Sequence, residues 1–222
     1  IEIEENERHV HTNPARGIYG AYTASAKVAG VGEHTLKPGQ SLTYSLFLSA
    51  HKKGELAPTV DIAAEQKARQ DRVTAVLGKL QLATPDPVLN TTFAFAKIRA
   101  AESIYRTAGG LMHGPGGGAY YAAIWANDQA EYANPFFAML GDPIATESAI
   151  NSFRHFARYM NPEYKPIPSS ITAEGATTWN GAGDRGDMAM IAYGAARFAL
   201  AYGDKKTADE LWPLIEWCLE YS

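Results

Sequence analysis

The sequence predicts a mostly α-helical chain with a small β region at its N-terminus. Strand-forming residues and turn signals fill roughly the first 55 residues, and from Pro58 onward apolar residues recur at helical spacing. Two helix pairs, each joined by a Gly-Asp link, then follow along the chain. These observations divide the chain into residues 1–56, 57–84 and 85–222.

The N-terminal region reads as strands near residues 16–28 and 42–49. Between them, Lys37-Pro38-Gly39-Gln40 predicts a type II turn, because proline fixes φ at the second position and glycine accepts positive φ at the third. Only about three strands fit into this region. So few strands need partners outside it to form a closed β structure.

The remaining chain carries helical patterns. Residues 60–80 mix scattered apolar residues with many polar ones, which is typical of a partly exposed linker helix. Proline and apolar spacing then predict the start of a longer helix near Pro87. Pro213 is expected to kink or interrupt the last helix, because proline lacks a backbone donor. The expected helices cover residues 87–107, 128–140, 144–160, 187–202 and 206–221.

Gly-Asp links join the helices of each pair, at Gly141-Asp142 and at Gly203-Asp204. Glycine just past a helix end favours a left-handed cap, and so short a link makes the two helices antiparallel. The two units stand about 60 residues apart, which is the length of a repeat. The other connections, residues 108–127 and 161–186, are long and are expected to emerge and meet at the opposite end of the helices.

The first long loop ends in residues suited to binding a sugar. Trp125 offers an apolar indole face for pyranose C–H groups, and Asn127 and Asp128 offer hydrogen bonds to hydroxyls. The alternative for Asp128 is that it only caps the helix that follows. The glycines at residues 109–118 do not predict a phosphate site, because no Gly-Lys-Ser/Thr triplet follows them.

The second long loop carries more carboxylates and another indole. Glu174 is a candidate catalytic acid if it is desolvated, and Trp179 is a candidate stacking platform. Asp184 and Arg185 are candidate substrate contacts, with the alternative that they pair to hold the loop. Asp187 is expected to cap the next helix.

Composition excludes several classes of function. The net charge of −4, without blocks of like charge, argues against nucleic-acid binding and against a polybasic membrane patch. No apolar run reaches the roughly 20 residues of a membrane span. The histidines form no metal-ligand pattern and no cofactor is expected. The lone cysteine, Cys218, is expected to be a small buried hydrophobe.

Three motifs, taken with the helix-pair repeat, resemble the six-hairpin (α/α)6 glycosidases, which include the glucoamylase-like, glycogen-debranching and α-rhamnosidase-like families. The resemblance covers most of the chain. The motifs are Trp125-Ala126-Asn127-Asp128-Gln129, Trp179-Asn180-Gly181 and Gly183-Asp184-Arg185-Gly186-Asp187.

The resemblance implies the end of a β-sandwich in residues 1–56, a linker helix in 57–84 and about the first five helices of an (α/α)6 toroid in 85–222. It also implies a glycoside hydrolase that acts on an oligo- or polysaccharide by carboxylate acid/base catalysis. The remainder of the protein, or another copy, is expected to complete the toroid, which leaves apolar helix faces exposed here.

The sequence departs from the family in two ways. Asn127-Asp128 stands where glucoamylase-like members have an Arg-Asp pair that grips the sugar. The general acid of those families follows the fifth barrel helix, beyond Ser222, so residues 1–222 alone are expected to lack hydrolase activity. A non-catalytic carbohydrate-binding protein, or a phosphorylase or isomerase on the same scaffold, remain the alternatives.

Overall fold

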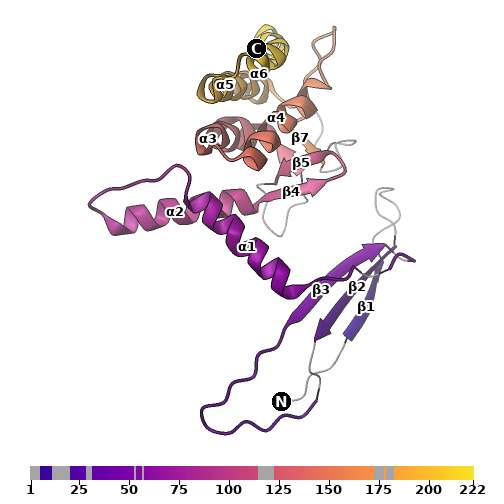
Figure 1. The fold of residues 1–222 in the computed structure, drawn as a ribbon. Coiled ribbons are helices and arrows are strands. Elements are labelled where there is room, and N and C mark those ends of the chain that lie inside the picture. The colour runs from indigo at the N-terminus through magenta and orange to yellow at the C-terminus, as the bar shows by residue number, and fades with distance from the viewer. Residues whose placement is uncertain are drawn as a thin grey trace. The chain divides into compact units, whose positions relative to one another are not determined.

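The structure, a computed structural model, shows a mostly α chain with small β-sheets (Figure 1). It forms two compact units, Ile1–Asp71 and Arg72–Ser222. The described residues are 6–11, 21–28, 32–52, 54–56, 58–114, 123–172, 178 and 183–222.

The first unit contains an antiparallel sheet of three strands in the order β1-β2-β3. The predicted type II turn before the third strand is confirmed, since Gly39 has φ +82° and the Gln40 N–H donates to the Lys37 carbonyl at 3.0 Å. Two of the described strands overlap the ranges predicted near 16–28 and 42–49, and the strand at Asn6–His11 was not predicted. The strands are β1 (Asn6–His11), β2 (Ala21–Val28) and β3 (Leu46–Lys52).

The expected linker helix is α1 (Ile62–Leu77). Its C-terminal end, from Arg72 onward, belongs to the second unit and is held there by polar contacts. Arg72 donates two hydrogen bonds to Asp142, at 2.6 and 2.8 Å, and the carboxylate is almost fully buried. The buried Lys97 donates to the Leu77 carbonyl at 3.1 Å, so a cation meets the negative end of α1.

Two antiparallel helical hairpins form the larger part of the second unit. α3 packs against α5, α4 packs against α6, and the helices of each hairpin contact each other. Buried aromatic rings, such as Phe153 and Phe198 at 5.8 Å between centroids, fill the space between the hairpins. The helices are α3 (Asn134–Leu140), α4 (Pro143–Ala157), α5 (Arg185–Tyr202) and α6 (Lys205–Tyr221).

The two Gly-Asp links have nearly the same geometry. Gly141 and Gly203 take left-handed φ values of +66° and +72°, as the sequence predicts. Asp142 and Asp204 then adopt φ/ψ of −92°/122° and −95°/117° and cap the next helix. Their carboxylates accept from backbone N–H groups three residues on, at 3.0 and 2.8 Å. Each link therefore ends one helix and starts the next.

The hairpins approach each other very closely at Gly194 in α5. A Cβ at this position would lie 2.2 Å from the carbonyl oxygen of Ala130. Ala130 belongs to η2 (Asp128–Ala133), a π-helical segment that leads directly into α3. Only glycine lets these two backbones come so close.

Some sequence predictions were wrong. Strands are not confined to the first 55 residues, and the helix expected at 87–107 is α2 (Pro87–Glu102). Ile104 continues the apolar helical spacing, but it belongs to β4 (Ile104–Thr107), which pairs with β5 (Gly110–His113) around a tight turn. Pro213 does not interrupt α6, and the alternative that it kinks the helix stays a prediction. Residues 128–160 are all described and contain no strand.

Gly194→Ala is expected to destabilise the second unit by about 1–3 kcal/mol, because the added methyl group forces the hairpins apart. Urea unfolding followed by tryptophan fluorescence would measure this, since all four tryptophans lie in the second unit. Gly78→Ala is the matched control. Its Cβ would meet no atom closer than 3.4 Å, and its unfolding midpoint should not fall.

Arg72→Ala is expected to cost roughly 2–3 kcal/mol, because it leaves the buried Asp142 carboxylate without its cation. Lys67→Ala removes an exposed ion pair with Asp71 on the same helix and should change stability by less than about 1 kcal/mol. The same urea titration compares the two variants. Equal effects would show that the Arg72–Asp142 pair does not anchor α1.

Candidate functional site

The two long loops meet through a short antiparallel ladder. β6 (Ala123–Trp125) pairs with β7 (Ser170–Thr172), with Trp125 opposite Ser170. The Ala126 N–H extends the ladder by donating to the Ser169 carbonyl at 2.8 Å. The prediction that these loops touch is therefore confirmed.

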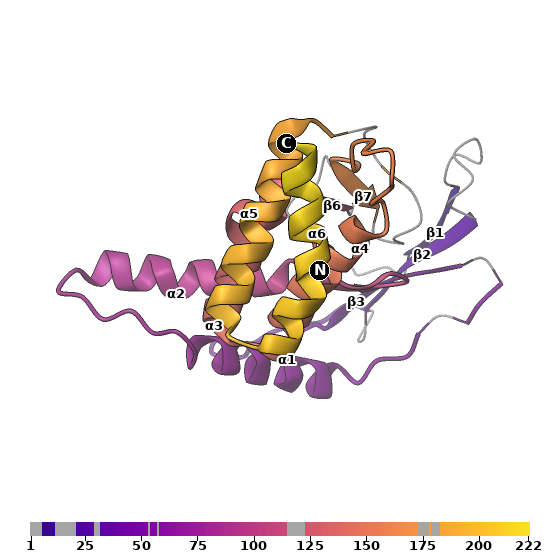
Figure 2. The same cartoon turned by 90° about the horizontal axis from the view of Figure 1, so that it is seen from above.

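The ladder reaches the start of α5. Thr178 forms a further antiparallel bridge with Ile171, and the Gly183 N–H donates to the Ile167 carbonyl at 2.9 Å. Since α5 has 18 residues, its start lies about 27 Å from the Gly203 turn. Figure 2 shows β6 and β7 near the C-terminal end of α6, far from that turn. The paired loops thus occupy one end of the hairpins and the Gly-Asp turns the other.

Three of the predicted sugar-binding residues lie where β6 passes into η2. Trp125 is half-buried and Asn127 is exposed at the start of η2, where its side chain makes no capping hydrogen bond. The Asp128 carboxylate accepts from the Tyr132 hydroxyl at 2.6 Å, one turn along. The alternative that Asp128 caps its helix is wrong. Its carboxylate is oriented instead by a phenol.

The hydrogen bond to Asp128 helps to shift the pKa of the Tyr132 phenol. Partial burial, the hydrogen bond to Asp128, and the charges of Asp128 and Glu131 together raise the pKa of Tyr132 to about 12. Tyr132 therefore stays protonated at neutral pH and keeps donating. The Tyr132 hydroxyl binds Oδ1 of Asp128, and Oδ2 accepts no hydrogen bond from the described residues.

The carboxylates of Asp184 and Asp187 cap the start of α5. Asp184 is the helix cap and accepts from the Asp187 N–H at 2.9 Å, while Asp187 accepts from the Asp184 N–H at 3.1 Å. This reciprocal capping box corrects the prediction that Asp187 is the cap. Burial raises the pKa of Asp187. The backbone hydrogen bond from Asp184 opposes this shift, and the nearby charge of Asp184 adds to it. Asp184 forms no ion pair with Arg185, and both residues are exposed and described.

A buried cluster of polar side chains next to η2 was not predicted from the sequence. The Gln129 side-chain amide donates to the His113 backbone carbonyl and lies 3.3 Å from the Nδ1 of the same histidine. The His113 imidazole packs edge-on against the Phe137 ring, with 5.2 Å between the ring centroids. Among the described residues, the Gln129 and Asn134 side-chain oxygens have no hydrogen-bond partner. No sequence signal marks this cluster, because its members come from β5, η2 and α3.

Glu174 and Trp179 lie outside the described residues. The described residue Thr178, between them, bridges Ile171 of β7. No hydrogen bond or ion pair joins Asp128 to Asp184 or Arg185, all three of which are described. The structure thus brings the two loop backbones together and leaves the side-chain convergence as a prediction.

A groove of about 730 Å³ opens elsewhere, between α6 and the segment after α4. Tyr164 and Tyr221 stack on Trp217, at 5.4 and 5.7 Å between ring centroids, and the indole N–H donates to the Asn161 carbonyl at 2.9 Å. The contacts with Tyr164 and Asn161 anchor that segment to α6. The groove is not part of the predicted site.

Two further findings concern the described part of the chain. It holds no group of three or more histidine, cysteine or acidic side chains arranged to bind a metal ion. None of its helices is both long and apolar enough to cross a membrane.

Comparison with known protein families, with curated proteins and with solved structures gave no match to this chain.

Buried histidines make the stability of the second unit depend on pH. Burial lowers the pKa of both His113 and His155, although hydrogen bonds to Gln129 and Gly109 oppose it. The folded state therefore takes up protons less readily than the unfolded chain, whose histidines titrate near about 6.5. The free energy of unfolding is expected to fall as the pH drops from 7.5 to 5.5.

Urea titrations at those two pH values test this expectation. His155→Gln should reduce the difference between them, and the exposed His34→Gln should leave it unchanged. The carboxylates of Asp142 and Glu210, whose pKa values lie below normal, affect stability only at lower pH. Equal stability at both pH values would contradict the expected effect of the buried histidines.

Proposed function

We propose that this chain is part of a glycoside hydrolase of the six-hairpin type that acts on an oligo- or polysaccharide. Sugar binds at the end of the helices where the two long loops pair. The observation that carries this proposal is the β6–β7 ladder, which joins the segment of Trp125 and Asp128 to the second loop. A binding cleft in such a repeat needs its long loops at one end.

The side chains at the first loop suit a pyranose. Trp125 supplies an indole, Asn127 supplies both amide donors and an acceptor, and Asp128 supplies a carboxylate whose direction Tyr132 fixes. A preorganised acceptor costs less conformational entropy when a hydroxyl binds. Trp179 and Glu174, in the second loop, are proposed to add a second aromatic face and an acid.

The wider architecture of the proposal is a partial (α/α)6 toroid preceded by the last strands of a β-sandwich. The near-identical Gly-Asp turns and the packing of α3 on α5 and α4 on α6 support a toroid. The three-stranded sheet and α1 stand in the order that the resemblance implies. Asp184, occupied as a helix cap, is a weaker candidate for sugar contact than Asp128.

Asp128→Ala is expected to weaken carbohydrate binding by roughly 1–3 kcal/mol, because it leaves sugar hydroxyls without an acceptor. Calorimetric titration of the complete protein with a panel of neutral oligosaccharides measures the change. Glu131→Ala, which removes an exposed carboxylate from the same segment, is the control and should leave affinity unchanged.

Each outcome separates the candidate functions. Binding together with release of reducing ends supports the hydrolase, and binding without turnover supports the non-catalytic alternative. Equal affinity of Asp128→Ala and the unmodified protein would remove Asp128 from the site. Absence of binding to every sugar tested would overturn the proposal.

A further inference from the structure

The groove between α6 and the segment after α4 has no part in the proposed function. Aromatic rings and carboxylates line it together, with Tyr164 and Trp217 beside Glu216 and Glu220 of α6. Its volume of about 730 Å³ is typical of sites that bind small molecules. The chemistry of its walls indicates which class of molecule fits.

A tight turn holds one aromatic wall of the groove in place. The Asn161 side chain accepts from the Lys165 N–H at 2.8 Å and donates to the Tyr159 and Lys165 carbonyls at 3.1 and 2.8 Å. The Tyr164 N–H donates to the Asn161 carbonyl at 3.3 Å, and Tyr164 takes a left-handed φ of +49°, which is uncommon for a large side chain. The turn thereby stacks the phenol ring on the Trp217 indole, at 5.4 Å between ring centroids.

The side chains that line the groove offer acceptors and almost no donors. The turn uses the Asn161 amide, and the Trp217 indole N–H donates to the Asn161 carbonyl at 2.9 Å. The Tyr164 hydroxyl is the one side-chain donor that remains among the lining residues, all of which the structure describes. A ligand for this groove must therefore bring its own donors, and the carboxylates favour a positive charge.

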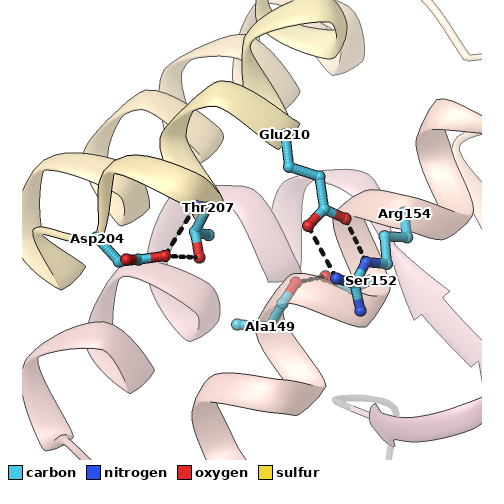
Figure 3. A network of polar contacts seen from close by, with 6 residues as sticks. All are labelled: Ala149, Ser152, Arg154, Asp204, Thr207 and Glu210. Atoms are coloured by element: carbon cyan, nitrogen blue, oxygen red, sulfur yellow. Dashed lines mark hydrogen bonds and ion pairs between the residues drawn. The ribbon is translucent and has the colours of Figure 1, made fainter.

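The carboxylates of α6 divide into two groups. Near the start of the helix, Lys205 donates to Asp209 at 2.6 Å, and Arg154 of α4 forms a two-pronged ion pair with Glu210 (Figure 3). Near its end, the two carboxylates that line the groove make no hydrogen bond or ion pair with any described residue. The unpaired charges of the helix are therefore the ones that face the groove.

The arrangement of Glu216 and Glu220 disfavours the helix that carries them. They stand at i and i+4, where like charges repel, and they lie toward the negative end of the helix dipole. No basic residue lies in the last turn of α6, and Lys165, next to Tyr164, forms no ion pair with either glutamate. A cation bound between the two glutamates would offset this repulsion.

We propose that the groove binds a small linear organic dication whose ammonium or guanidinium groups contact Glu216 and Glu220. The Cβ atoms of residues one turn apart are about 6 Å from each other, a spacing that a short alkyl chain between two cationic groups spans. The Tyr164 ring packs against the planar guanidinium or against the alkyl chain. This inference does not use the sugar chemistry, so either proposal can fail without the other.

Other occupants match the groove less well. A divalent metal ion needs more oxygen ligands than two glutamates supply, and the described residues contain no group of three side chains that would hold one. A peptide needs an open strand edge or a long apolar groove, whereas this groove follows α6 only from Pro213 to Glu220, about 10 Å. A neutral sugar would leave both charges unmatched.

Calorimetric titration of the full chain with agmatine, which carries a guanidinium and an ammonium group, tests the proposal. Agmatine should bind roughly tenfold or more tightly than hexanediol, a neutral chain of similar length. In proton–nitrogen NMR spectra, agmatine should shift the indole N–H signal of Trp217, which Trp217→Phe identifies. The signal of Trp125 should not move.

Variants separate the charged contacts from the aromatic one. Glu216→Gln and Glu220→Gln should each weaken agmatine binding roughly five- to tenfold, and their unfolding midpoints should not fall because the repulsion is removed. Glu147→Gln, which changes an exposed carboxylate near the start of α4, is the matched control and should leave the affinity unchanged. Tyr164→Asn removes the ring but keeps a residue that tolerates left-handed φ, and it should weaken binding roughly threefold or more.

Four results would overturn the proposal. Equal binding of agmatine and hexanediol would remove charge from the recognition. An equal loss of affinity in Glu147→Gln and Glu216→Gln would assign the binding to the general negative charge of the chain. An unchanged affinity in Tyr164→Asn would remove the aromatic wall. Tighter binding of an arginine-containing peptide than of agmatine would assign the groove to a protein partner.

Discussion

The structure of the second unit depends on the turn made by a left-handed glycine followed by a capping aspartate. Gly141 and Gly203 end their helices in a conformation that costs glycine little, and Asp142 and Asp204 satisfy the first N–H groups of the next helix. Because the link is so short, each helix must return beside the previous one. The long connections must then emerge at the other end of the hairpins, where β6 and β7 pair.

These turns could be predicted from sequence because their signals are local. Glycine and aspartate act through their own backbone angles and through N–H groups three residues away, as did Pro38 and Gly39 in the first unit. The strands β4 to β7 could not be predicted in the same way. Strands of three or four residues are too short to show alternation, and Ile104 satisfies a helical pattern equally well. Pairing partners far along the chain decide their conformation.

The candidate site likewise combines features that the sequence could predict with features that it could not. Sequence alone could not separate a carboxylate that caps a helix from one that faces a ligand, because both stand at helix starts. The hydrogen bonds identify the caps, since Asp184 and Asp187 bind each other's backbone while Asp128 binds only the Tyr132 hydroxyl among the described residues. The cluster of Gln129 and His113 could not be foreseen either, because its two members meet only after β5 and η2 have packed.

The scaffold and the site are joined at η2. Ala130, two residues after Asp128, forms a close backbone contact between the hairpins, against Gly194 of α5. The same short segment therefore carries the candidate binding residue Asp128, which is partly exposed, and packs one hairpin against the other. A π-helical turn is wider than an α-helical one and is tolerated mainly where surrounding packing determines it. At η2 that packing comes from α5, so the position of Asp128 is set by a contact between hairpins as well as by its own loop.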